Sequence, residues 1–100
     1  MSGVDSREEK RMLGQNFPVS EYYRSHIIDA HAISRAGGWW TAILLISDPQ
    51  TGKPFIGLYK WQSDGEKWKT RNKFLIRKRA DAKTLIDLLE KYSNKLKDSE

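Results

Sequence analysis

The side chains with the clearest chemical potential are nine basic residues between positions 53 and 79. They are Lys53, Lys60, Lys67, Lys69, Arg71, Lys73, Arg77, Lys78 and Arg79. Only two acidic residues, Asp64 and Glu66, lie among them, so this stretch has a net charge of +7 within a chain whose net charge is +5. A local positive patch of this kind attracts a polyanion.

Aromatic residues accompany these cations in two segments with strand-like alternation, 54–62 and 68–77. In the first, Phe55, Gly57, Tyr59 and Trp61 share one side, and in the second Lys69, Arg71 and Lys73 alternate with Trp68, Thr70, Asn72, Phe74 and Ile76. Unpaired cations are too costly to bury. We therefore expect Phe74 and Ile76, with Ile56 and Leu58, to face the core, and the Phe55–Trp61 side to lie beside the cations on an open face.

Rings and cations on one open sheet face suit single-stranded nucleic acid. Unpaired bases stack on aromatic rings, and lysine and arginine neutralise the phosphates between them. The predicted stacking residues are Phe55, Tyr59 and Trp61, and Gly57 would leave room for a base. The predicted phosphate contacts are Lys53, Lys60, Lys67, Lys69, Arg71, Lys73 and Arg77.

The same rings and cations are also compatible with different roles. Edge strands carry lysines simply to prevent aggregation, and aromatic residues are common in strands. The aromatic face could instead dock a protein partner, and nothing in the residues separates DNA from RNA. If residues 22–33 form a helix rather than a strand, the element order becomes that of a double-stranded RNA-binding domain.

Enzymatic chemistry has little support in the sequence. The chain has no cysteine, and His26 and His31 are five positions apart, a spacing that places them on opposite faces of a strand. No third ligand accompanies them, and no glycine-rich phosphate loop is present. We therefore expect a non-enzymatic protein without a metal or another cofactor.

The length of 100 residues predicts one domain, residues 19–98, after a flexible N-terminal arm of residues 1–18. The predicted strands are 27–33, 39–47, 54–62 and 68–77, with a helix from Asp81 to about Lys97 that Asp81 would cap. This is an α+β fold, β-β-β-β-α. No apolar run approaches the roughly 20 residues of a membrane span, so we expect an intracellular protein of the cytoplasm, nucleoid or nucleus.

The predicted sheet is wider than one helix can cover. Four strands span nearly 20 Å, whereas a helix covers about 10 Å. A second copy of the chain would complete the core, so we expect a homodimer that associates through the helix. The predicted dimer contacts are Leu85, Leu88, Leu89, Tyr92 and Leu96.

The run from Gly52 to Tyr92, GKPFIGLYKWQSDGEKWKTRNKFLIRKRADAKTLIDLLEKY, resembles the DNA-binding domain of the transcriptional coactivator family called positive cofactor four. The likeness lies in a strand that ends in Trp61, an acidic turn at residues 63–66, a basic stretch, a short apolar strand and an amphipathic helix. Residues 27–33 and 39–46 would be the first two strands of that family.

This resemblance implies a curved four-stranded antiparallel sheet that dimerises through its helices. It also implies channels for single-stranded or unwound DNA, little sequence preference and the transcription machinery as a partner. By match to the pattern, Trp61, Lys53, Lys69, Arg71 and Lys73 would bind the strand. The chain departs from the family at Asn72-Lys73, where a glycine is usual, and it lacks a long serine-rich acidic region.

Overall fold

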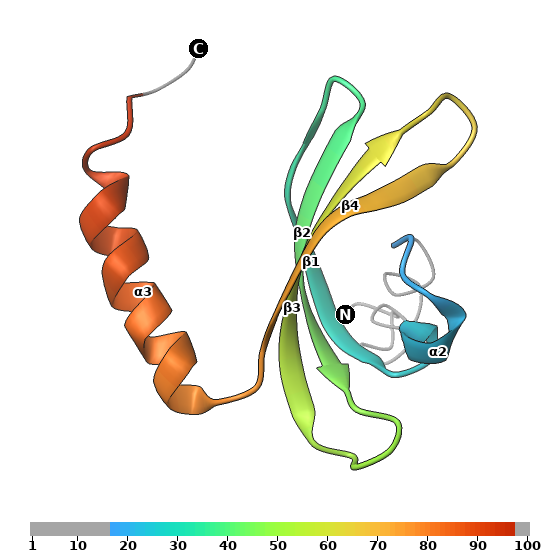
Figure 1. Ribbon diagram of the computed structural model, residues 1–100, viewed down its shortest axis with the longest axis horizontal. Helices are drawn as coiled ribbons and strands as arrows, with labels where there is room; N and C mark the ends of the chain where they lie inside the picture. Colours follow the sequence, from blue (N-terminus) through green and yellow to red (C-terminus); the bar gives the residue numbers. More distant parts are fainter. Residues whose placement is uncertain (1–16, 98–100) are drawn as a thin grey trace, which may run out of the picture.

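The computed structural model describes residues 17–97 and has the predicted α+β architecture (Figure 1). The elements are α2 (Glu21–Arg24), β1 (Ile27–Ala36), β2 (Trp39–Ser47), β3 (Pro54–Ser63), β4 (Trp68–Ile76) and α3 (Arg79–Ser93). The four strands form one antiparallel sheet in the order β1-β2-β3-β4. The ambiguous region resolves into one helical turn followed by a strand, so the order of a double-stranded RNA-binding domain is not observed.

Short turns join neighbouring strands and fix their register. Gly37 and Gly38 connect β1 to β2 with φ angles of 62° and 81°, the left-handed conformation that a two-residue hairpin turn requires. This turn places Arg35 opposite Trp40. Figure 1 shows that the β1–β2 and β3–β4 hairpins lie at one end of the sheet and the β2–β3 turn at the other.

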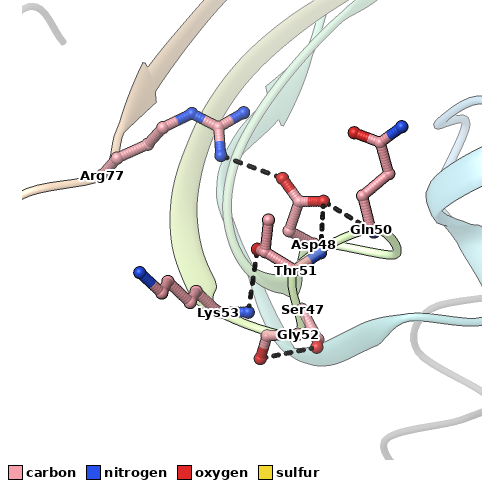
Figure 2. Close-up of polar contacts among 7 residues, drawn as sticks. All are labelled: Ser47, Asp48, Gln50, Thr51, Gly52, Lys53 and Arg77. Carbon is pink, nitrogen blue, oxygen red and sulfur yellow. Dashed lines mark hydrogen bonds and ion pairs between the residues drawn. The ribbon is translucent and has the colours of Figure 1, made fainter.

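The β2–β3 turn is built around the carboxylate of Asp48 (Figure 2). One carboxylate oxygen, Oδ1, accepts the backbone N–H groups of Gln50 at 2.8 Å and Thr51 at 3.4 Å. The other, Oδ2, accepts a hydrogen bond from Nη1 of Arg77 at 3.1 Å. The N–H of Gln50, followed by the contacts with Arg77 and Thr51, lowers the pKa of Asp48. The turn is thereby joined to the residue that follows β4.

The core lies between the sheet and the segment that precedes β1. Apart from Ile76, the partner of Ile56, the buried sheet residues share one face, and Phe17 and Val19 pack on it from the N-terminal side. Phe17, which the sequence assigned to the arm, is thus part of the core; residues 1–16 of that arm lie outside the described residues. The prediction of an open face for Phe55, Tyr59 and Trp61 is wrong, because their exposed fractions are 2%, 4% and 0%.

Helix α3 lies on the other side of the sheet from α2 (Figure 1). None of its residues is buried, and it is joined to the sheet by the short connection that follows β4. It begins at Arg79, and its N-cap residue Lys78 makes no side-chain hydrogen bond to it. The predicted cap by Asp81 is therefore wrong: Asp81 lies within the first turn, where its negative charge favours the helix dipole.

A β-bulge changes the alternation of β4. Leu58 pairs with Phe74, but a register shift between Lys60 and Trp61 makes Trp61 the partner of Thr70. Cross-strand partners share a face. Thr70 therefore lies on the Trp61 side of the sheet and Phe74 on the opposite side, whereas strict alternation had placed the two together.

Candidate nucleic-acid interface

One face of the sheet carries a group of aromatic rings, here called the aromatic cluster. Its members are Trp40, Phe55, Tyr59, Trp61 and Trp68. The rings of Tyr59 and Trp61 stack with centroids 5.4 Å apart and an interplanar angle of 15°. Trp40 meets Trp61 edge-on at 5.2 Å and Trp68 edge-on at 5.3 Å. Strands β2, β3 and β4 all contribute, so the cluster crosses the sheet.

Residues 17–25, here called the N-terminal cover, lie on this cluster. The Phe17 ring lies 5.0 Å from that of Trp40 and 6.0 Å from that of Trp61. At the other end, Tyr23 meets Phe55 edge-on at 5.6 Å. The cover, rather than α3, therefore removes the predicted stacking residues from solvent.

Two arginines flank the aromatic cluster. The guanidinium of Arg35 lies over the ring of Trp40 at 4.0 Å and over that of Trp68 at 5.2 Å. The guanidinium of Arg77 lies over Phe55 at 4.4 Å. Between them Lys73, an exposed residue, is the cross-strand partner of Tyr59. Of the predicted phosphate contacts, Lys73 and Arg77 thus lie on the same face as the rings, and those rings are covered.

The other predicted phosphate contacts are divided between the two faces. Lys60 lies on the opposite face, with its ammonium 4.8 Å from the Trp39 ring centroid. Lys69 also belongs to that face, as the partner of Gln62, and forms an ion pair with Asp64 at 3.6 Å. Arg71 donates a hydrogen bond to the side chain of Gln62 at 3.0 Å. The remaining two, Lys53 and Lys67, are exposed and adjoin the turns.

Acidic groups modify the positive field at both ends of β4. The backbone N–H groups of Lys67 and Glu66 lower the pKa of Asp64, which keeps its carboxylate negative beside Lys69. At the other end, the pKa of Asp48 is also lowered, and its carboxylate pairs with Arg77. Lys73 has no carboxylate within ion-pair distance among residues 17–97. Its charge, like that of Arg35, is therefore not offset by an ion pair within the described residues.

Burial controls the chemistry of Tyr59. Desolvation, and secondarily the nearby phenol of Tyr23, raises the pKa of Tyr59 above 10.0. The phenol of Tyr59 is therefore harder to ionise than an exposed one.

Gly57 has a different role from the predicted one. A Cβ at this position would lie 2.7 Å from Cε1 of Tyr59 and 3.5 Å from a methyl group of Leu75. The missing side chain therefore leaves room for the ring of Tyr59, which belongs to the same strand, rather than for a base.

Sequence reasoning missed Arg35, Trp40 and Trp68 as members of this surface. Trp39 and Trp40 are adjacent, so alternation alone could not say which one faces the cluster. The two-residue Gly37-Gly38 turn did contain the signal, because it makes Arg35 the partner of Trp40. No comparable signal marks the bulge that turns Trp68 toward Trp40.

The opposite face of the sheet carries apolar side chains that are largely uncovered, beside Lys60 and Lys69. The prediction that Phe74 faces the core is wrong, because Phe74 is 58% exposed there; Ile43 is 38% exposed. A hollow of about 290 Å³ opens beside Phe74 and is lined by Thr41, Leu58, Tyr59, Lys60, Asn72 and Lys73. This is the side on which α3 lies (Figure 1), and α3 leaves Ile86, Leu89 and Tyr92 more than half exposed.

The described residues contain no cluster of three or more histidine, cysteine, aspartate or glutamate side chains arranged to hold a metal ion. Within the same range, neither helix is both long and apolar enough to span a membrane. Comparisons of the chain with protein family models, with curated proteins and with solved structures found no match.

Proposed function

We propose that the protein binds single-stranded nucleic acid, DNA by preference, as a non-enzymatic homodimer. The observation that carries this proposal is the surface made by the aromatic cluster, with Arg35 and Arg77 over its outer rings and Lys73 beside Tyr59. Planar rings offer surfaces on which unpaired bases stack, and cations beside them neutralise the phosphates between those bases. The preference for DNA, and a role beside the transcription machinery, come from the resemblance to the positive cofactor four family.

The exposed cations of β4 and its hairpin make the first contact in this proposal. Lys67, Arg71 and Lys73 are exposed, and β4 is an edge strand with no neighbour on its outer side in the sheet. A strand that runs along this edge would release counterions from its phosphates, so the affinity would fall as salt rises. For single strands the logarithmic slope is about 0.7 per phosphate neutralised, and three to four contacts give a slope of about 2–3.

The direct test is a salt titration of oligonucleotide binding with a charge-matched control. The variant Lys69→Ala/Arg71→Ala/Lys73→Ala removes three charges from β4, and Lys83→Ala/Lys91→Ala/Lys95→Ala removes three exposed charges from α3 and the residues that follow it. The β4 variant should bind more weakly and with a shallower slope than the α3 variant. Equal losses would show that only net charge attracts the strand, and a slope near zero in the wild type would contradict the proposal.

Strand preference is tested with single strands and duplexes of matched length. A sheet surface with stacked rings accommodates unpaired bases, whereas duplex DNA is read by helices or ribbons that enter a groove. Single-stranded DNA should therefore bind more tightly than the duplex. RNA strands of the same sequence should bind nearly as well, since no described contact distinguishes a 2′-hydroxyl. Stronger binding of the duplex would overturn the proposal.

The homodimer is proposed from the two uncovered apolar surfaces that lie on the same side of the sheet. An isolated 15-residue helix is marginal in water, and α3 buries none of its residues in the protomer. A second copy would cover the apolar side of α3, including Leu85, Leu88, Leu89, Tyr92 and Leu96, and the uncovered sheet face around Phe74. Dimerisation would then bury both surfaces.

A further inference from the structure

Among residues 17–97, the N-terminal cover contacts the aromatic cluster through side-chain packing and makes no hydrogen bond to it. Its hydrogen bonds are internal, namely Val19 N–H to Phe17, Tyr23 and Arg24 N–H to Ser20, and the Arg24 guanidinium to the carbonyl of Val19, except that the carbonyl of Tyr23 accepts the N–H of His26 at 2.8 Å, at the turn that follows the cover. The first hydrogen bond to the sheet follows the cover, where the carbonyl of His26 accepts from Ser47 N–H at 2.9 Å. The cover can therefore leave the sheet without breaking any of the backbone hydrogen bonds of the sheet.

The surface beneath the cover has two unsatisfied hydrogen-bond donors. The indole N–H groups of Trp40 and Trp61 are both buried, and neither has an acceptor among residues 17–97. A buried donor without a partner is destabilising, because it has lost its hydrogen bonds to water and gained none in the protein. In the covered state the apolar parts of these rings are removed from water, but their N–H groups have no hydrogen-bond partner. A ligand with a flat apolar face and hydrogen-bond acceptors would both cover the rings and accept hydrogen bonds from the two N–H groups.

We propose that the N-terminal cover and single-stranded nucleic acid compete for the aromatic cluster. In this proposal the strand displaces residues 17–25 as a unit, with the turn at residues 25–26 as the hinge. Unpaired bases then stack on Trp40, Tyr59 and Trp61, and their carbonyl and ring nitrogen acceptors take the two indole N–H groups. The proposal rests on the proposed function and adds that the chain regulates its own base-binding surface.

The competition predicts how the stability of the cover changes the apparent dissociation constant of the strand. A protein whose binding-competent form has population f binds with an apparent dissociation constant equal to the intrinsic one divided by f. Weakening the cover raises f and tightens binding, although it removes stabilising contacts from the protein. A segment with only a structural role would have the opposite or no effect on affinity.

Hydrogen exchange of the wild-type protein tests the displacement directly. Amide exchange is measured with and without a saturating oligothymidylate, at a salt concentration where binding is established. Peptides that cover residues 17–25 should exchange faster when the oligonucleotide is bound, while those from β3 and β4 should be protected. Binding with unchanged or greater protection of residues 17–25 would overturn the competition and the stacking of bases on the cluster, and would leave a strand held by the exposed cations of β4. No binding at all would remove both.

A matched pair of variants tests the sign of the effect. Phe17→Ala removes a buried ring of the cover, and Tyr22→Ala removes a ring from the same segment that is 54% exposed. We expect Phe17→Ala to bind oligothymidylate about tenfold more tightly or better, and Tyr22→Ala to bind like the wild type. Weaker or equal binding by a folded Phe17→Ala would contradict the proposal. If this variant does not fold, the exchange experiment on the wild type decides.

Discussion

The guanidinium carbon of Arg35 lies 4.0 Å from the centre of the Trp40 ring, across the β1–β2 hairpin. The same guanidinium reaches the Trp68 ring at 5.2 Å, so one side chain of the edge strand β1 joins rings from β2 and β4. A planar guanidinium over an aromatic face is held in position while its remaining N–H groups point outward. Arg35 is therefore placed to meet a phosphate at the rim of the aromatic cluster.

The first prediction concerns this residue. Arg35→Ala should weaken binding of single-stranded DNA and lower the logarithmic salt slope by about 0.7, the value for one lost phosphate contact. Arg35→Lys keeps the charge but loses the planar fork, and should retain most of the slope with part of the affinity. Fluorescence anisotropy titrations at several salt concentrations give both quantities. An unchanged slope in Arg35→Ala would mean that Arg35 only packs on the rings.

Trp61 supplies the second prediction. A stacking residue on an open surface could be truncated without loss of stability, but Trp61 is completely buried. Trp61→Ala should lower the free energy of unfolding by about 3–5 kcal/mol, as large-to-small changes of aromatic core residues do. Trp61→Phe, which keeps most of the ring volume, should lower it much less. Urea denaturation measures both. A loss below about 1 kcal/mol in Trp61→Ala would show that the cover does not bury this ring in solution.

The fold class could be predicted from the sequence, but only part of the candidate nucleic-acid interface could. Turn residues and alternation are local signals, and they were sufficient for the last three strands and the C-terminal helix, whereas residues 22–33 were left open between a helix and a strand. Alternation also correctly placed Tyr59 and Leu58 on opposite faces of the sheet. It could not say which face would be covered, because that depends on the packing of Phe17 and Val19, residues distant in sequence from β3.

Two further errors have equally physical causes. The argument that lysines cannot be buried held, since Lys73 is exposed, but exposure of a lysine does not expose its cross-strand neighbour Tyr59. Long side chains keep their charge in water at the rim of a covered surface. The register shift between Lys60 and Trp61 depends on how β3 pairs with β4, so the sequence of neither strand alone predicts it. Trp68, which strict alternation placed on the side of Phe74, therefore lies on the side of Trp61.

Gly57 gives the third prediction. A Cβ at this position would approach the Tyr59 ring to 2.7 Å, so Gly57→Ala forces that ring out of its stack with Trp61. We expect the free energy of unfolding to fall by about 1–3 kcal/mol, the usual effect of overpacking. Adding Tyr59→Leu, whose shorter side chain does not reach the same space, should recover much of what Gly57→Ala loses. Additive losses in the double variant would contradict this steric cause.

Asp48 gives the fourth prediction, which concerns pH. Its folded-state pKa lies below the ordinary value of 3.8, chiefly because the N–H of Gln50 binds the carboxylate. The charged form is therefore favoured in the folded state, and its stabilisation is complete above pH 3.8 and lost as the pH falls through the folded-state pKa. The melting temperature of the wild type should exceed that of Asp48→Asn at pH 7, and the difference should narrow below pH 3.8.

A second variant separates the causes at this turn. Arg77→Gln removes the ion pair at 3.1 Å but leaves the backbone N–H groups of Gln50 and Thr51 on the carboxylate. It should therefore keep most of the acid-dependent loss of stability. If Arg77→Gln abolished the pH dependence as fully as Asp48→Asn, the arginine rather than the turn would be the main cause.

Leu89 gives the fifth prediction, which tests the homodimer. Its side chain is 58% exposed in the protomer, so Leu89→Glu should cost a monomer very little. In a dimer joined through α3, the same change would place a carboxylate in an apolar interface, which is strongly unfavourable. Lys83→Gln is the matched control: it changes the net charge by the same amount, on the polar side of α3.

Light scattering with gel filtration distinguishes the two outcomes. The wild type and Lys83→Gln should have twice the mass of the 11.6 kDa chain, and Leu89→Glu the mass of one chain. The melting temperature of the wild type should rise with protein concentration, as it does when association stabilises the folded state, and that of Leu89→Glu should not. A monomeric wild type would show that α3 and the sheet face around Phe74 stay uncovered by a second copy. The strand would then bind to one sheet rather than between two.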